Sequence, residues 1–221
     1  MSISIPVITI DGCSGSGKGS VGLVLAKELV WHFLDSGALY RALAFAAQQV
    51  VCSVDSNQLI DFIAHSWQFF CFTEQQVIWK NQDITAQIRT QTCASVASHL
   101  ASNPQLRQAL LPCQHAFRQA PGLVADGRDM GTVVFPDAQL KIFLHAQYEE
   151  RARRRYLQLK ALGIHASLDS LRSALIARDD RDQKRSAAPL QIAEGALVID
   201  TTHQSVAEVV AFIKTALKPT V

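Results

Sequence analysis

Short apolar runs recur along the chain and predict five strands. They lie at residues 5–10, 32–35, 122–126, 140–145 and 196–200. Runs of this length that are rich in β-branched residues are typical of strands buried on both faces of a sheet. Aspartates stand at four of the strand ends, namely Asp11, Asp35, Asp126 and Asp200.

Helical patterns separate these runs. Val21, Val24, Leu25 and Leu29 recur on one face of a helix, and another helix is expected from about 37 to 50. Further helices are expected from Asn103-Pro104, at about 147–162, at about 168–180 after Ser167, and after Ser205, where Ser205-Val206-Ala207-Glu208 forms a capping box. Strands alternating with helices predict an α/β fold with a parallel sheet that binds ligands at the carboxyl ends of its strands.

Residues 66–88 interrupt this alternation. Short aromatic and β-branched runs surround turn-like segments at Thr73-Glu74-Gln75 and Lys80-Asn81-Gln82-Asp83. This pattern predicts a small antiparallel sheet inserted into the α/β frame. We expect Trp67 and Trp79 to pack within the insert and not to offer a stacking surface for bases.

Composition narrows the class of protein. With 221 residues, 48% of them hydrophobic, the chain can form one domain with insertions or two small domains. No apolar run reaches the roughly 18 residues that span a bilayer, and no signal peptide is visible. The five cysteines include no C-x-x-C pair and the seven histidines show no metal-ligand spacing, so we expect a reducing, cytoplasmic environment.

A glycine-rich loop follows the first predicted strand. Residues 12–20 read GCSGSGKGS, which has the G-x-x-x-x-G-K spacing of a phosphate-binding loop. A strand, a glycine loop and a helix in that order let backbone N–H groups surround phosphate oxygens, while Lys18 adds a full positive charge. Gly19 stands where the usual motif has a magnesium-binding Ser or Thr, and the hydroxyl follows at Ser20.

Two further segments carry groups suited to phosphates. DSGALYR, residues 35–41, places Ser36 at a helix start with Arg41 one turn later, although an ordinary N-cap would read the same. ADGRDMGT, residues 125–132, puts Asp126 at a strand end, the position of a magnesium-binding carboxylate in phosphate-loop enzymes.

Positive charge is concentrated in one region although the net charge is only +2. Ten of the 21 basic residues lie between Arg151 and Arg185, a segment with four acids. On the helix EERARRRY, residues 149–156, Glu149–Arg153 and Glu150–Arg154 are spaced as i,i+4 ion pairs. That spacing offers Arg151 and Arg155 no carboxylate on the helix, so we expect both to be available to an anion. ARDDRDQKR, residues 177–185, is either a solvated charge run or part of the same anion site.

Together these motifs resemble bacterial cytidylate kinases, a family of nucleoside monophosphate kinases. GCSGSGKGS, DSGALYR, GRDMGT and RDDRD occur in the order and spacing of that family, and the similarity covers nearly the whole chain. The family's loop reads G-x-x-G-x-G-K-G-[ST], so Gly19 is expected. Cys13 departs from the usual proline, and Ser20 from the frequent threonine.

The resemblance implies a phosphate-loop kinase core with a five-stranded parallel sheet flanked by helices, a small inserted antiparallel sheet and a mobile lid. We expect one domain over residues 1–221. Its parts would be a core of 1–36, 120–148 and 164–221, a monophosphate-binding segment with the insert at about 37–119, and a lid at about 149–163.

The resemblance also assigns site residues. ATP would bind the loop residues Gly12, Cys13, Ser14, Gly15, Ser16, Gly17, Lys18, Gly19 and Ser20. The transferring phosphoryl group would be stabilised by the catalytic residues Lys18, Arg128, Arg151 and Arg155. Ser36, Arg41 and Arg128 would bind the CMP phosphate. Ser98, Arg107 and Asp129 would bind the base. Arg178, Asp182 and Arg185 would hold the ribose and phosphate. Asp126 would hold Mg²⁺ through water, and a direct contact from Ser20 stays open.

The implied activity is transfer of the γ-phosphoryl group of ATP to CMP or dCMP, giving ADP and CDP or dCDP, in pyrimidine nucleotide metabolism. Mg²⁺ accompanies ATP. We expect a cytoplasmic monomer with these small-molecule substrates and no nucleic-acid or membrane partner.

Two alternatives remain open from the residues alone. A phosphate-loop kinase for a sugar, an acid or a nucleoside would need a carboxylate base, for which Asp35 is the candidate. A nucleotide-dependent binder of nucleic acid would use the basic segment 151–185 and would show a steep salt dependence. The chain has no N-K-x-D motif, which disfavours a signalling GTPase.

Overall fold

The computed structural model describes residues 5–49, 57–73, 76–161, 163, 165–185 and 187–217. Cys52, the turn residues Glu74 and Gln75, and Leu162 of the expected lid lie outside these ranges. The chain divides into two compact units, one formed by residues 1–34 and 118–221 and the other by residues 35–117. The second unit spans nearly the stretch expected to bind the monophosphate. That role, like the lid, stays a prediction.

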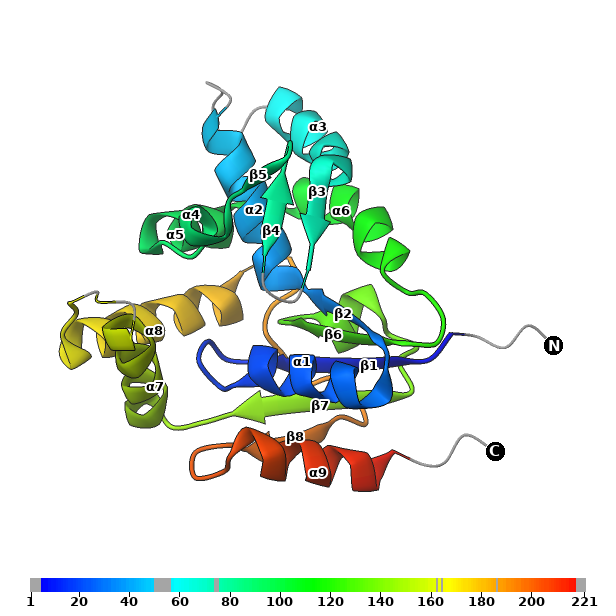
Figure 1. Cartoon of the computed structure of the whole chain (residues 1–221), viewed down its shortest axis with the longest axis vertical. Coiled ribbons are helices and arrows are strands. Elements are labelled where there is room, and N and C mark those ends of the chain that lie inside the picture. The colour runs from blue at the N-terminus through cyan, green and yellow to red at the C-terminus, as the bar shows by residue number, and fades with distance from the viewer. Residues whose placement is uncertain are drawn as a thin grey trace. The chain divides into compact units, whose positions relative to one another are not determined.

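A five-stranded parallel sheet is the centre of the first unit (Figure 1). Its order is β2-β6-β1-β7-β8, with bounds β1 Val7–Gly12, β2 His32–Asp35, β6 Leu123–Gly127, β7 Leu140–His145 and β8 Leu197–Asp200. All five predicted strands are confirmed. Because β1 lies in the middle, with Ile10 opposite both Asp126 and Ile142, the loop that follows it leaves from the centre of the sheet.

The first unit has four longer helices, α1 Lys18–Leu29, α7 Tyr148–Ala161, α8 Leu168–Lys184 and α9 Val206–Ala216. Helices α1 and α9 lie against the sheet, whereas α7 and α8 pack against each other. Ser167 caps α8, and the capping box at Ser205 and Glu208 is present at the start of α9, as the sequence predicted. Helices α1 and α9 pack side by side (Figure 1), and Ile8, Leu25 and Ile213 belong to the apolar core between them and the sheet.

The second unit is mainly helical around a small antiparallel sheet. Its helices are α2 Ser36–Gln49, α3 Asn57–Ser66, the 3₁₀ turn Trp67–Phe69, α4 Thr85–Ile88, α5 Gln91–Leu100 and α6 Pro104–Ala116. The sheet has the order β3-β4-β5, with β3 Phe70–Phe72, β4 Val77–Trp79 and β5 Gln82–Asp83. The predicted insert is therefore confirmed.

The turn between β4 and β5 is tighter than the sequence suggested. Lys80 and Asn81 both have positive φ, 48° and 66°, which suits a two-residue hairpin turn. Gln82 and Asp83, expected to belong to the turn, instead pair with Trp79 and Ile78.

Trp79 anchors the core of the second unit. Its ring stacks on Phe70 at 6.0 Å and meets Phe45 edge-on at 5.7 Å between centroids. Trp67 packs against the same cluster of buried residues. The prediction that both tryptophans serve packing is confirmed.

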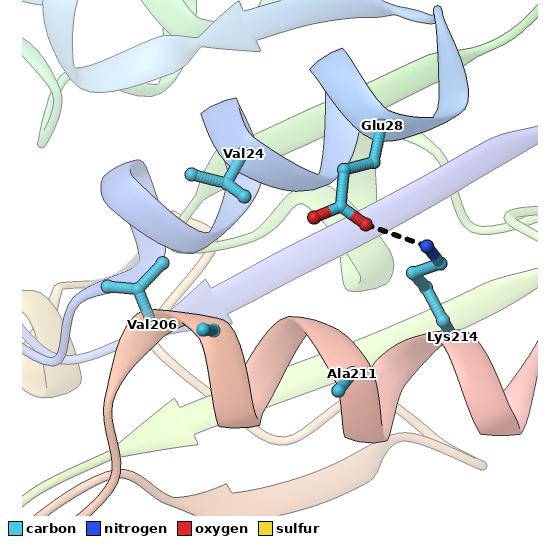
Figure 2. Close-up of a pocket in the computed structure, with 6 residues that line it drawn as sticks. Val24, Glu28, Val206, Ala211 and Lys214 are labelled. Atoms are coloured by element: carbon cyan, nitrogen blue, oxygen red, sulfur yellow. Dashed lines mark hydrogen bonds and ion pairs between the residues drawn. The ribbon is translucent and has the colours of Figure 1, made fainter.

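A pocket lies between α1 and α9, and its lining includes none of the predicted site residues (Figure 2). It has a volume of about 480 Å³, and its lining residues are Val24, Glu28, Val206, Ala207, Ala211 and Lys214. An ion pair of 2.7 Å between Glu28 and Lys214 joins the two helices across it. Among the described residues, no helix combines the length and apolar character needed to cross a membrane.

Replacing Trp79 by alanine is expected to destabilise the protein. Removing a buried indole from contact with Phe45 and Phe70 should lower the free energy of unfolding by about 3 kcal/mol. Urea unfolding followed by far-UV circular dichroism measures this change. Phe69→Ala is the matched control, because that neighbouring ring is 60% exposed. A loss below about 1 kcal/mol for Trp79→Ala would contradict the packing role.

Candidate active site

The phosphate loop connects β1 to α1 and depends on its glycines. Gly12 has φ 149°, and a Cβ there would lie 2.0 Å from the carbonyl oxygen of Leu144. Gly15 and Gly17 have φ 80° and 92°, a region that favours glycine. Helix α1 begins at Lys18, so the loop ends at a helix N-terminus.

Lys18 is buried among like charges. Its Nζ donates to the carbonyl oxygen of Cys13 at 3.0 Å. Burial, together with the charge of Arg128, lowers the pKa of Lys18 to about 8, while the charge of Asp126 opposes the shift. A cation whose charge is this costly in the empty protein favours an anionic ligand such as phosphate.

Asp126 explains the glycine at position 19. A Cβ on Gly19 would lie 3.1 Å from Asp126 Oδ2, so a Ser or Thr there would crowd the carboxylate. The Ser20 side chain is exposed, whereas Asp126 is buried. Among the described residues, no group of three or more His, Cys, Asp or Glu side chains could hold a metal ion. Asp126 and Ser20 offer few protein ligands, which fits a Mg²⁺ ion whose ligands come mainly from nucleotide phosphates and water.

Asp11 ties the end of β1 to the loop after β6. Its two carboxylate oxygens accept hydrogen bonds from the backbone N–H groups of Met130 and Gly131, each at 2.8 Å. Burial raises the pKa of Asp11 to about 6, although both hydrogen bonds lower it. Sequence reasoning noted Asp11 only as a strand end and missed this positioning role. The signal was a carboxylate between an apolar strand and a glycine loop.

Arg128 and Asp182 form a close buried pair. Arg128 Nε donates to Asp182 Oδ2 at 2.7 Å. Burial alone would lower the pKa of Arg128, but the nearby carboxylates, Asp182 first among them, together raise it. Burial alone would likewise raise the pKa of Asp182, but Arg128, Arg178 and Arg185 hold it below its usual value. The structure thus brings these sequence-predicted residues together.

Asp129 lies next to this pair in sequence and is also buried. Its Oδ1 is 3.8 Å from Arg185 Nη2. Asp129 directly precedes the π-helix Met130–Val134, and its carbonyl oxygen accepts hydrogen bonds from the N–H groups of Val133 and Val134. π-helical turns are rare and often occur at functional sites.

The charged segment 177–185 is only partly a solvated charge run. Asp180 is exposed and pairs with Lys184, whereas Asp179 and Asp182 are buried.

The ion pairs expected on α7 are partly wrong. Glu150 pairs with Arg154 as predicted, but also with Arg153, while Glu149 pairs with Arg172 of α8. The i,i+4 rule failed for Glu149 because packing of α7 against α8 offered it a partner from another helix.

Arg151 is not available to an anion as the sequence suggested. Its side chain is 2% exposed and pairs with Asp179 of α8 at 2.5 Å. Arg155 is partly buried, and its Nη1 lies 3.4 Å from the side-chain oxygen of Gln158. The expectation that both arginines await an anion is therefore wrong for Arg151. The catalytic role of Arg155 stays a prediction.

Two residues that sequence reasoning missed also support the loop. Thr201, after β8, donates from Oγ1 to the carbonyl oxygen of Ser16 at 2.8 Å. Arg154 in turn donates to Thr201 Oγ1 at 3.2 Å and to the Thr201 carbonyl oxygen. The motif at 149–156 indicated only the pair of Arg154 with Glu150, and no motif indicated these supporting contacts, because the partners are distant along the chain.

The second unit carries its own candidate residues. Ser36 is buried at the start of α2, and Asp35 caps this helix by accepting the Ala38 N–H at 2.8 Å. Arg41 Nη2 lies 3.9 Å from Asp35. Asp35, the candidate base of a hydroxyl kinase, is therefore occupied as a helix cap.

Some polar atoms of the second unit are buried without a protein partner. Arg41 Nε and Ser98 Oγ have no hydrogen-bond partner among the described residues. Arg107 donates to the carbonyl oxygen of Ala101 at 3.1 Å, and its guanidinium lies 5.6 Å from the centre of the Tyr40 ring. Buried donors such as Arg41 Nε and Ser98 Oγ call for a ligand or water to satisfy them.

A family model described as cytidylate kinase matches residues 8–218. The chain belongs to the cytidylate kinase family. It is 52% identical to a cytidylate kinase from Pseudomonas entomophila, over 98% of this chain and 97% of that protein. It is 51% identical to one from Enterobacter sp. (strain 638), over 95% and 94%. The crystal structure of TT1252 from Thermus thermophilus has a TM-score of 0.47 at 17% identity, over 98% of this chain and 100% of that one, which adds nothing to the assignment.

Binding of ADP is expected to draw a proton onto Lys18. Because the pKa of Lys18 is lowered to about 8, about half of the molecules should lack this proton at pH 8 before ADP is added, and the bound phosphates should restore it. Affinity should therefore fall as the pH rises from 8 to 9. Calorimetry in buffers of different ionisation enthalpy measures the uptake.

The controls for this experiment come from the same helix. Lys27→Gln, near the end of α1, should keep the proton uptake, and Lys18→Gln should abolish it. Uptake that is absent between pH 8 and 9 in the unchanged protein would contradict a lowered pKa at Lys18.

Proposed function

We propose that this protein transfers the γ-phosphoryl group of ATP to CMP, and to dCMP, giving ADP and the nucleoside diphosphate. Membership of the cytidylate kinase family over residues 8–218 carries the proposal. The phosphate loop supports it, because Lys18 is held beside the loop backbone with its charge poorly compensated.

The reaction requires positive charge more than proton transfer. The attacking oxygen of CMP already belongs to an anionic phosphate near neutral pH, so no general base is needed. Asp35, occupied as the cap of α2, is consistent with this. Lys18 and Arg128 would stabilise the charge that develops on the transferring group, with Arg155 as a further candidate.

The remaining assignments follow from the resemblance and are part of the proposal. Ser36, Arg41 and Arg128 would bind the CMP phosphate. Arg178, Asp182 and Arg185 would hold the ribose and phosphate. The buried donors Arg41 Nε and Ser98 Oγ support ligand contacts in the second unit. Asp126 would hold the Mg²⁺ that neutralises the nucleotide phosphates, through water. The exposed position of Ser20 offers no support for a direct contact.

Asp129 is proposed to read the base. Cytosine presents an N4 amino donor where uracil presents the O4 acceptor, and an ionised carboxylate can only accept a hydrogen bond. Asp129 is buried, with Arg185 3.8 Å away to balance its charge. A uracil O4 in the same position would set one acceptor against another, with no hydrogen bond between them.

A screen of phosphoryl acceptors tests the function. A coupled assay that follows ADP formation should show transfer from ATP to CMP and dCMP, with UMP and AMP much poorer. Cytidine and shikimate should not be phosphorylated, because their neutral hydroxyls need a base. Efficient use of either hydroxyl compound, with CMP inactive, would replace this proposal by a hydroxyl kinase.

The Asp129→Asn variant tests the base reader. Wild type should prefer CMP to UMP by about a hundredfold in kcat/KM, since losing the charge-assisted hydrogen bond to the base and facing O4 instead costs about 3 kcal/mol. The asparagine amide can turn to donate to O4, so the variant should narrow this ratio, mainly by losing activity on CMP. Asp137→Asn is the control, because Asp137 pairs with Arg118 at the surface. A ratio unchanged by Asp129→Asn would rule out this role.

A further inference from the structure

The peptide groups of Ser14 in the phosphate loop are held by a buried ion pair. The N–H of Ser14 donates to Asp179 Oδ1 at 3.4 Å, a long hydrogen bond, and its carbonyl oxygen accepts from Arg151 Nη1 at 2.9 Å. The same Arg151 Nη1 donates to Asp179 Oδ2 at 2.5 Å. One loop residue, one arginine of α7 and one aspartate of α8 therefore form a closed network.

Other contacts fix Arg151 in this position. Its Nε donates to the carbonyl oxygen of Ala146 at 2.9 Å, and its guanidinium lies 4.3 Å from the centre of the Tyr148 ring. The side chains of Arg151 and Asp179 are 2% and 1% exposed. Several fixed partners and almost no exposed surface are typical of a positioning residue and not of a movable ligand of the substrate.

The backbone of α7 also lies directly against the loop. A Cβ on Gly15 would lie 3.2 Å from the Cβ of Arg151 and 3.6 Å from its carbonyl oxygen. The start of α7, which falls within the lid expected from sequence, is thus in contact with the phosphate loop.

We propose that Arg151 and Asp179 are positioning residues that hold the phosphate loop in its nucleotide-binding shape. The inference rests on the proposed function, because it assumes that the loop binds a nucleotide. It replaces the role that the resemblance gave Arg151, contact with the transferring γ-phosphoryl group. A glycine-rich loop without this support must be ordered when the nucleotide binds, and that conformational entropy weakens affinity.

ADP separates the two roles of Arg151. It has the phosphates that a phosphate loop surrounds but lacks the γ-phosphoryl group. A residue that only stabilises the transferring group would therefore change kcat and leave ADP affinity unchanged. A residue that shapes the loop changes ADP affinity itself.

The experiment measures ADP affinity by calorimetry in conservative variants. Arg151→Lys keeps the charge but cannot reach Ala146, Ser14 and Asp179 together. Asp179→Asn keeps an acceptor for the Ser14 N–H but loses its charge. We expect each to weaken ADP binding by at least tenfold, because each loses a hydrogen bond to a charged group. The double variant should lose less than the product of the two effects, since both act on the same network.

Matched controls lie beside each residue. Asp180→Asn changes the neighbouring carboxylate, which is exposed and pairs with Lys184. Arg153→Lys changes an exposed arginine of α7 that pairs with Glu150. Both should bind ADP within twofold of wild type.

The outcomes separate this inference from the proposed function. Unchanged ADP affinity in a folded Arg151→Lys or Asp179→Asn variant overturns the inference, whether kcat or only thermal stability falls. Wild type that binds ADP but does not phosphorylate CMP contradicts the proposed function and leaves this test intact. Wild type that binds no ADP overturns both.

Hydrogen exchange gives a test that needs no variant. In the wild-type protein without nucleotide, the Ser14 amide should exchange at least a hundredfold more slowly than in an unstructured peptide, because Asp179 accepts it in a buried site. Exchange at the unprotected rate would show that the network does not hold the loop, and would overturn the inference even if both variants fail to fold.

Discussion

The arrangement of charges in the first unit depends on one constraint. Several cations are held close together in a site with little water, and this has an electrostatic cost. Burial and the charge of Arg128 together lower the pKa of Lys18 to about 8. Like charges repel strongly where water is excluded, so a protein can keep them together only with carboxylates between them. Asp126 and Asp182 supply that compensation for Lys18 and Arg128. The balance is incomplete, and an incoming polyphosphate is the ligand that would complete it.

Helix α8 is the element that distributes this compensation. Asp179 and Asp182 are three residues apart, so they face the same side of the helix. Asp182 holds Arg128 at the end of β6, and Asp179 holds Arg151 of α7 together with the Ser14 peptide. One helix face thereby fixes both the phosphate loop and the arginine next to Asp129. The shape of the site would depend on α8 as much as on the loop itself.

Much of the fold could be predicted because its signals are local. The strand–loop–helix order around residues 12–20, the capping box at Ser205 and the inserted sheet with Trp79 follow from spacing within a few residues. The candidate site was predicted less completely. The loop and the residues around Arg128 were found from motifs, whereas the supporting contacts of Asp11, Arg154 and Thr201 were missed because each acts on a distant backbone group.

The sequence by itself determined the order of the elements, the identity of the phosphate loop and the family resemblance. These depend on periodicity and on motifs that the backbone geometry requires. The i,i+4 spacing predicted the Glu150–Arg154 pair, but only the tertiary structure decided which charges pair between different elements. Arg151 seemed available on its own helix, yet its partner Asp179 lies 28 residues further along the chain. Glu149 pairs with Arg172 of α8, not with the expected Arg153. An ion pair forms wherever packing brings opposite charges together and excludes water, and local spacing does not encode that proximity.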